Sequence, residues 1–353
     1  MLHPADKAVL RLTLSLGLAA SLAYGFAMPA PFLVCVMAAM VACKPGPPIP
    51  LGRGVVVSVV MALLLSAGIL MVPLLEYYAT AGVMLTAAML YLVFFTGAYR
   101  ANPLVTMILV IAVAVIPVVG TAEQILAPLI SVTLAVGLAV GILVSGISHA
   151  FFPDAARPSP AKSIGSPRPS RQAAAWFALR ATLIMMPVFV LALTNPSFYL
   201  AAVIKTITLA QQSGTTTART AGRELVGSTA MGAWMAVLAW GGLSLWPNLW
   251  MLVLWLMAAG LWSGVRLFRL KNSSFPPSFW SNALVTMLIL LGPAIEDSAN
   301  GKDVYQALVV RVFLFIGVAL YAWATVWVLE RVRVLWPLGV RGRGGVRGLS
   351  RTG

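Results

Sequence analysis

Long, uninterrupted apolar runs constrain this chain more than any other feature of its sequence. Runs approaching about 20 residues recur along nearly the whole length, and a helix of that size is needed to cross a hydrocarbon core about 30 Å thick. The chain is 60% hydrophobic and 9% charged, with a mean hydropathy of +0.94, whereas about a quarter of the residues in soluble domains are charged. The sequence therefore predicts an integral membrane protein.

The apolar runs predict an all-α integral membrane protein with about twelve transmembrane helices. Continuous apolarity favours helices over a β-barrel, whose strands alternate in polarity over about ten residues. Three expected helices are short for a full crossing, so they are tilted, broken or longer than the runs indicate. These three are 30–43, 197–211 and 280–293. The other nine are 8–27, 55–75, 78–98, 103–120, 124–150, 173–193, 224–245, 248–268 and 304–330.

The formal charge of +15 is divided unequally between alternate loops. One set of loops carries most of the Lys and Arg residues, whereas the other set carries Lys302 as its one cation. This asymmetry follows the positive-inside rule, so we predict a bacterial inner-membrane protein with both termini in the cytoplasm. It favours contact with membrane lipids over nucleic acid. The acidic residues of the opposite loops are Glu76, Glu123, Glu296, Asp297 and Asp303.

The sequence is internally duplicated. The segment ANPLVTM at 101–107 aligns with SNALVTM at 281–287, and RLTLSL from Arg11 aligns with RATLIM from Arg180. Each half then contributes six helices, an even number, so both halves have the same orientation in the membrane. We predict two parallel six-helix repeats related by a pseudo-twofold axis along the membrane normal. Because the repeat uses the first apolar run as a full helix, a cleaved signal peptide there is the weaker alternative.

The duplication divides the chain into four parts. The repeats occupy 1–150 and 172–330. Residues 151–171 are rich in Pro, Ser and Arg and predict a flexible cytoplasmic linker. Residues 331–353 predict a basic, disordered cytoplasmic tail. An alternative interpretation is that the arginine-rich tail binds RNA. It is the weaker one, because arginines beside a cytoplasmic helix end more often contact anionic lipid.

Recognisable catalytic motifs do not occur in the sequence. The chain has two histidines and no HExxH, Walker or GxSxG motif, so we expect no enzyme activity, metal or cofactor. Its two cysteines, Cys35 and Cys43, lie eight positions apart on one expected helix. That separation is too long for a mutual disulfide.

Three cations fall inside expected helices: Arg180, Lys205 and Arg311. A charge at the bilayer centre costs roughly 3 kcal/mol or more, so it needs a partner, a watery cavity or an escape to the interface. Arg180 and Arg311 lie close enough to helix ends for the side chain to reach the interface. Lys205 lies near the middle of its segment, so it is the stronger candidate for a functional role.

At helical spacing Lys205 shares a face with Phe198, Ala201, Thr208 and Gln212. A cation, a hydroxyl and an amide along one stripe suit an organic anion. A structural lysine that is hydrogen-bonded to backbone carbonyls explains the same pattern equally well. The carboxylates lie at helix ends or in loops, so if transport is proton-driven, Lys205 or Glu224 is our candidate for carrying the proton.

The segment that begins at Arg223 carries a family resemblance. Arg223, Gly227, Thr229 and Gly232 follow the pattern Arg, Gly-x-Thr, Gly, and together with the six-plus-six layout they resemble the fusaric acid resistance protein superfamily. The first half departs from this pattern after Arg53. The resemblance is to a compact bacterial branch and implies export of aromatic or other hydrophobic carboxylates, often beside a periplasmic adaptor of the membrane fusion type. Related plant malate-channel domains line an anion path with cations.

The resemblance and the buried cations together predict an exporter of small organic anions with a site between the repeats. In this hypothesis Lys205 holds the carboxylate, Thr208 and Gln212 hydrogen-bond it, and Arg180 and Arg311 set a positive potential. Two alternatives stay open. The chain could be a non-transporting scaffold for an adaptor complex, with structural cations, or a passive anion channel.

Overall fold

The computed structural model describes residues 3–44, 46–100, 103–153, 169–213, 218–301 and 303–335. These residues form helices and connecting loops and contain no strand. Most of the expected linker and tail, together with Lys302, lies outside the described residues. The last helix continues past 330 to Leu335.

Helices cover every apolar run that the sequence predicts to be helical. In the first half they are α1 (Pro4–Gly25), α2 (Pro31–Ala42), α3 (Leu51–Ala67), the 3-10 turn η1 (Gly68–Leu70), α4 (Met71–Tyr77), α5 (Ala79–Arg100), α6 (Pro103–Val110), the π-helical turn η2 (Ile111–Val115), α7 (Ile116–Ala122) and α8 (Leu126–Phe151). In the second half they are α9 (Arg171–Thr194), α10 (Pro196–Gln212), α11 (Ala218–Ala221), the π-helical turn η3 (Gly222–Val226), α12 (Gly227–Leu245), α13 (Leu249–Leu267), α14 (Pro277–Ala299) and α15 (Val304–Leu335).

Ten helical segments in the described part of the chain are long and apolar enough to cross a membrane. This is the architecture of a multi-pass membrane protein. The three segments expected to be short differ from one another. The helix α14 has 23 residues and is among the ten, whereas α10 has 17 and α2 has 12. At 1.5 Å per residue, α2 is only about 18 Å long.

Polar residues at the turns fix where several helices begin. The Asn195 side chain accepts a hydrogen bond from the Phe198 backbone N–H at 3.3 Å, and Pro196 occupies the first turn of α10. Asn248 caps α13 in the same way through the Met251 N–H at 2.7 Å. These side chains satisfy backbone donors that a helix leaves unpaired at its start.

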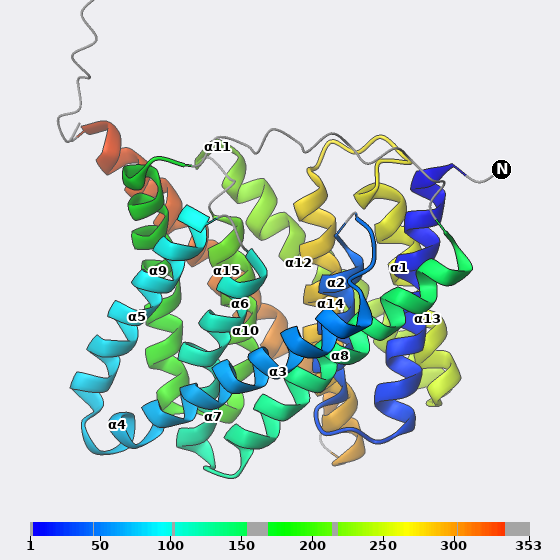
Figure 1. Ribbon diagram of the computed structural model, residues 1–353, viewed down its shortest axis with the longest axis horizontal. Helices are drawn as coiled ribbons and strands as arrows, with labels where there is room; N and C mark the ends of the chain where they lie inside the picture. Colours follow the sequence, from blue (N-terminus) through cyan, green and yellow to red (C-terminus); the bar gives the residue numbers. More distant parts are fainter. Residues whose placement is uncertain are drawn as a thin grey trace, which may run out of the picture.

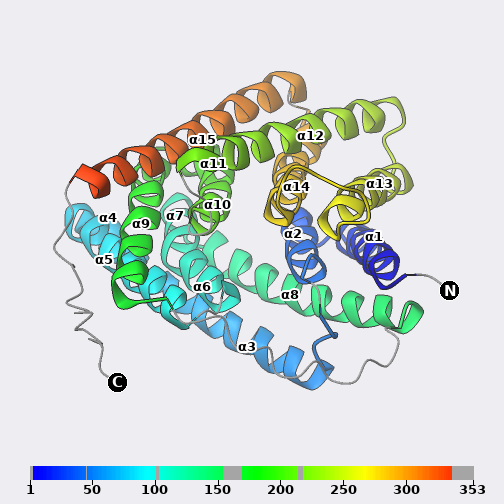
Figure 2. The same ribbon diagram turned by 90° about the horizontal axis from the view of Figure 1, so that it is seen from above.

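The two halves of the sequence interleave in space. Viewed from above (Figure 2), α3 and α8 lie along one side of the molecule and α12 and α15 along the other. Between them, α1 and α2 stand beside α13 and α14, whereas α9 and α10 stand beside α5, α6 and α7. Each inner group therefore contains helices from both halves (Figure 1).

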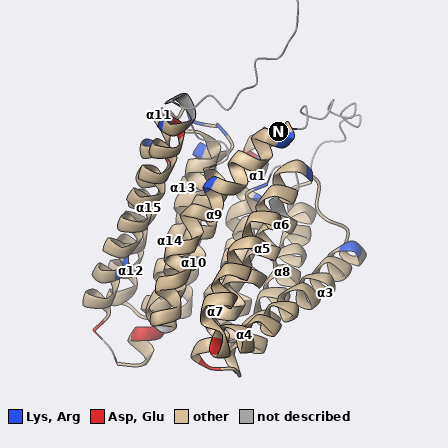
Figure 3. Ribbon diagram, turned by 90° about the vertical axis from the view of Figure 1, so that its left-hand side faces the viewer, with Lys and Arg blue, Asp and Glu red and all other residues tan. Residues whose placement is uncertain are grey.

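Charged residues concentrate at opposite ends of the helices. Figure 3 shows most of the Lys and Arg residues near the end where the N-terminus lies, and acidic residues near α4 and in loops at the other end. Among the ten candidate spans, α14 has the largest buried share, 78%. It contacts α2, α10, α12, α13 and α15, so it lies at the centre of the bundle.

Candidate functional site

The fully buried Lys205 lies on α10 and faces α14. Its Nζ donates a hydrogen bond to the Thr286 hydroxyl at 2.7 Å and another to the Asn282 side-chain carbonyl oxygen at 3.2 Å. Asn282 and Thr286 are one helical turn apart on α14, so both side chains reach the same point. Lys205 is therefore hydrogen-bonded by side chains and not by the backbone carbonyls that the sequence had suggested.

A second layer of polar groups holds Asn282 in position. Its Nδ2 donates to the Ser228 hydroxyl on α12 at 2.6 Å, and the Thr286 hydroxyl donates to the Asn282 backbone carbonyl at 2.6 Å. Ser228 and Thr286 are completely buried. The cluster Lys205, Asn282, Thr286 and Ser228, here called the lysine cluster, thus joins three helices.

Close approach of α12 and α14 makes the lysine cluster possible. A Cβ atom added to Gly232 would lie 2.5 Å from the Ala283 backbone oxygen and 2.5 Å from the Thr286 Cβ. Only a glycine fits at that contact. Gly227 lies one turn and a half earlier, against Phe279, at a looser 3.2 Å. The glycines of the resemblance motif therefore lie where α12 packs on the helix that contacts Lys205.

The other polar residues of the Lys205 stripe contact the protein interior. Gln212 Nε2 donates to the Ser278 backbone carbonyl of α14 at 2.9 Å, which places Gln212 on the same side of α10 as Lys205. The Thr208 hydroxyl donates back to the Lys205 carbonyl at 2.7 Å. Of the predicted stripe, Lys205 and Gln212 both contact α14, whereas the Thr208 hydroxyl bonds its own helix and Phe198 is exposed.

Arg180 lies on α9 and contacts a different helix from those of the lysine cluster. The side chain is buried, and its Nη1 lies 3.6 Å from the Glu330 carboxylate of α15. Arg11, which the sequence alignment pairs with Arg180, is also buried and donates from Nε to the Lys7 carbonyl at 3.2 Å.

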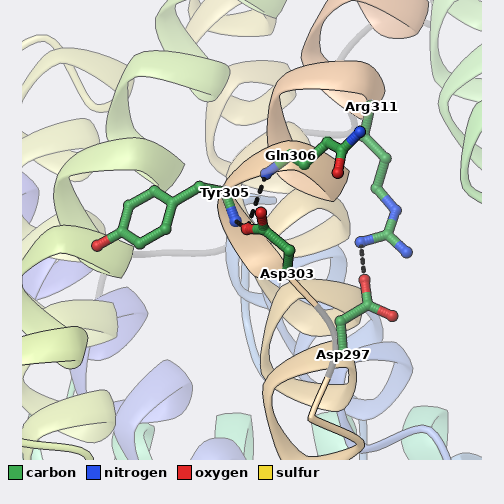
Figure 4. A network of polar contacts seen from close by, with 5 residues as sticks. All are labelled: Asp297, Asp303, Tyr305, Gln306 and Arg311. Carbon is green, nitrogen blue, oxygen red and sulfur yellow. Dashed lines mark hydrogen bonds and ion pairs between the residues drawn. The ribbon is translucent and has the colours of Figure 1, made fainter.

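Arg311 lies at the acidic end of the molecule, where α14 and α15 meet. Its Nη1 contacts the Asp297 carboxylate at 2.6 Å (Figure 4). In the same view Asp303 accepts hydrogen bonds from the backbone N–H groups of Tyr305 and Gln306 and so caps the start of α15.

The structure does not bring the three cations together. Arg180 contacts Glu330, and 19 residues of α15, about 28 Å of helix, separate Glu330 from Arg311. A single small anion cannot touch both arginines in this conformation. Of the three cations, Lys205 is the most deeply buried, at 0% exposure. Among the residues that the structure describes, no carboxylate forms an ion pair with it.

The remaining motif residues lie at the start of α12. Arg223 and Glu224 are in the π-helical turn η3, where the Arg223 guanidinium lies 5.3 Å from the centre of the Phe275 ring. The Thr229 hydroxyl is buried and donates to the Leu225 carbonyl at 2.7 Å. Glu224 is partly buried and lies at the basic end of the molecule. In the described part of the chain, no group of three or more His, Cys, Asp or Glu residues could hold a metal ion.

Sequence reasoning missed the partners of Lys205. Asn282 and Thr286 lie four positions apart inside an apolar run, and that spacing was the signal that could have found them. Both also belong to the segment SNALVTM that reveals the repeat. Ser228 carried no comparable signal, because a lone serine in a membrane helix commonly bonds its own backbone.

Comparison with protein-family models, with curated proteins and with solved structures finds no match to this chain.

Proposed function

We propose that this multi-pass membrane protein is a transporter, and not an enzyme, that exports small organic anions. The observation that carries the proposal is the fully buried Lys205, whose hydrogen-bond partners in the described residues are the neutral side chains of Asn282 and Thr286. An ammonium group is costly in the interior of a membrane protein unless its charge is compensated. A transported carboxylate is a natural partner for this charge.

All four residues of the lysine cluster lie in the second half, but two of the helices that carry them pack on the first half, which supports a site at the boundary of the two halves. Lys205 lies on α10, which packs against α7 and η2 of the first half, and its partners lie on α14, which packs against α2 of the first half. A shift of the halves relative to each other would open these contacts. Thr208 and Gln212 would then add hydrogen-bond donors beside Lys205, whereas Arg180 and Arg311 contribute positive potential from a distance.

The neighbours of each helix support two parallel repeats with about twelve crossings. Under the alignment of the halves, α1 corresponds to α9 and α13 to α5. The pair α1 and α13 is in contact, and so is the corresponding pair α9 and α5. The contact of α1 with α2 likewise has its counterpart in that of α9 with α10. A pseudo-twofold axis along the membrane normal produces both matches.

The charge distribution supports a bacterial inner membrane with both termini in the cytoplasm. The direction of transport, the preference for aromatic or hydrophobic carboxylates and a periplasmic adaptor as partner rest on the resemblance carried by Arg223, Gly227, Thr229 and Gly232. If transport is coupled to protons, Glu224 and Lys205 are the proposed proton carriers.

Efflux of a labelled acid tests the proposal. Cells that lack their own efflux systems are loaded with labelled 4-hydroxybenzoic acid and express wild type, Lys205→Met or the control Lys271→Met. Lys271 is exposed, so the control removes the same charge outside the bundle. We expect faster efflux from cells with wild type or Lys271→Met than from cells with an empty vector. Cells with Lys205→Met should show the efflux rate of the empty vector, although the membrane contains as much of this variant as of wild type. Equal efflux from wild type and empty vector across a panel of aromatic acids contradicts the proposal.

A scaffold for a periplasmic adaptor is the second candidate, and one observation favours it. Lys205, Arg180 and Arg311 each already have a contact within the protein, so none requires a substrate. If this function holds, a tagged chain co-purifies with an adaptor, and efflux depends on the presence of the chain but not on the Lys205 charge.

A further inference from the structure

A small cavity lies on another side of α10, away from the partners of Lys205. It has a volume of about 70 Å³ and lies between α2, α3, α6, α8 and α10. Four methionines form much of its wall: Met37, Met40, Met61 and Met107. Methionine side chains are flexible and polarizable, so such a wall adapts to small differences in ligand shape.

Two polar side chains join this apolar wall. Lys44 follows the end of α2, and Gln211 lies in the last turn of α10. The Gln211 Nε2 atom is buried and has no hydrogen-bond partner among the described residues. A buried amide without a partner costs free energy, so its presence at a cavity wall indicates a group that binds there.

The charge of Lys44 adds to this indication. Lys44 is exposed overall, but partial desolvation still lowers the pKa of its ammonium. No acidic residue lines the cavity. A bound anion would offset this partial desolvation of the ammonium.

We propose that this cavity binds a small hydrophobic monocarboxylate. The carboxylate accepts hydrogen bonds from the Lys44 ammonium and the Gln211 amide, and the apolar part of the ligand lies among the methionines. The volume sets the size of the apolar part of the ligand. A cavity of roughly 150 Å³ holds the six carbons of benzene, so a cavity of about half that volume suits the three-carbon chain of butyrate, with the carboxylate beside Lys44 and Gln211.

The cavity lies toward the basic end of the molecule, because Lys44 and Gln211 are both at helix ends on that side. If the chain exports anions, this is the end at which they enter. Binding itself does not depend on export, so the inference goes beyond the proposed function and can be tested without a transport assay.

Equilibrium dialysis of the full-length protein in detergent against ¹⁴C-butyrate tests the inference. We expect saturable binding of one butyrate per chain, displaced by unlabelled butyrate and not by butyramide, which has the same shape without the charge. Benzoate should compete more weakly, because its ring requires the methionines to move. Absence of saturable butyrate binding to the wild-type protein overturns the inference.

Variants of the two polar residues identify the site. We expect Lys44→Gln to weaken butyrate binding about tenfold or more and Gln211→Leu to weaken it by a smaller factor. The control Lys271→Gln, which changes an exposed lysine, should leave the affinity unchanged. Unchanged affinity in Lys44→Gln, or an equal loss in Lys271→Gln, contradicts the site.

A cavity-filling variant and Lys205→Met complete the test. Met61→Phe should abolish butyrate binding. Elution of this variant as a single species in size-exclusion chromatography shows that it has folded. If it has not folded, the affinity of Lys44→Gln alone decides whether the cavity is the binding site. Lys205→Met should bind butyrate normally. Butyrate binding without efflux leaves this inference standing while the proposed function fails, whereas efflux without butyrate binding refutes the inference alone.

Discussion

At the scale of single residues, what separates the buried cations is the kind of partner each has. Arg180 and Arg311 contact carboxylates, so their charges are compensated within the protein. Lys205 is hydrogen-bonded to a hydroxyl and an amide, and these groups solvate the ammonium without neutralising it. Of these three cations, Lys205 is therefore the one whose charge a bound anion would compensate most.

The bond between Lys205 and Asn282 can be measured by a double-mutant cycle. Asn282→Leu leaves a buried ammonium with one partner fewer, and we expect a loss of about 1–3 kcal/mol of stability. Lys205→Met combined with Asn282→Leu should cost less than the sum of the two single changes, because neither polar group then lacks its partner. Thermal unfolding in detergent gives the values. The exposed Asn300→Leu serves as control, and additive costs would show that the two side chains do not interact.

Two neighbouring aspartates should differ in their contribution to stability. Asp297→Ala leaves the mostly buried Arg311 without its ion-pair partner, for which we expect a loss of about 3 kcal/mol. Asp303→Ala removes only the cap of α15, worth about 1 kcal/mol. Unfolding midpoints of the two variants, measured together, check the order. An equal or smaller effect of Asp297→Ala would mean that the ion pair does not form in the membrane.

At the scale of helices, small residues decide how closely the backbones approach, and this controls where polar groups meet. Ser228 reaches Asn282 because Gly232 allows α12 to lie directly on α14. In the first half, Gly97 allows the same kind of approach between α5 and Thr106 of α6. Gly232 therefore helps to place the side chains of the lysine cluster, although the glycine itself makes no polar contact.

Two glycines of α12 offer a matched comparison. Gly232→Ala places a Cβ 2.5 Å from backbone and side-chain atoms of α14, so we expect a loss of about 1–3 kcal/mol and a weakened lysine cluster. At Gly241 an added Cβ meets nothing within 4 Å, so Gly241→Ala should be neutral or slightly stabilising. Unfolding temperatures in detergent distinguish the two. Equal behaviour would contradict the packing of α12 on α14.

The helices themselves were predictable, because each corresponds to an apolar run that is visible in the sequence. The residues at which the helices end were harder to predict. The run 280–293 ends at Pro293, but α14 continues through this proline to Ala299, because surrounding helices support the turn. The π-helical turns at Ile111–Val115 and Gly222–Val226 left no sequence pattern.

The candidate site was predictable only in part. Lys205 stood out because a charge in an apolar run is costly wherever the run folds. Its partners Asn282 and Thr286 depend on which helices become neighbours. The cavity beside Gln211 depends on gaps left by five helices, and gaps of this kind have no signature in a sequence.

At the scale of the whole molecule, the number of crossings depends on α10 and α2, which lie outside the ten candidate spans, and α2 is the shorter, with 12 residues. If α2 crosses with the loops that flank it, residue 46 lies in the cytoplasm. After Cys35 and Cys43 are replaced by Ser, Gly46→Cys should react with a membrane-permeant maleimide and not with an impermeant one. Gly301→Cys, in a loop at the acidic end, should react with both. Reaction of Gly46→Cys with the impermeant reagent in intact cells would contradict twelve crossings.

The interleaving of the halves has a consequence for the order in which the protein is made. The helix α1 packs tightly along α13, where a Cβ at Gly17 would lie 2.8 Å from the Met257 sulfur and one at Gly260 would lie 2.7 Å from Leu16. A ribosome that has synthesised α1 must therefore add more than two hundred further residues before α13, the partner of this face of α1, exists. Until then the small-residue face of α1 meets only lipid or the translocation machinery. A chain that stops in the linker leaves that face without its partner helix.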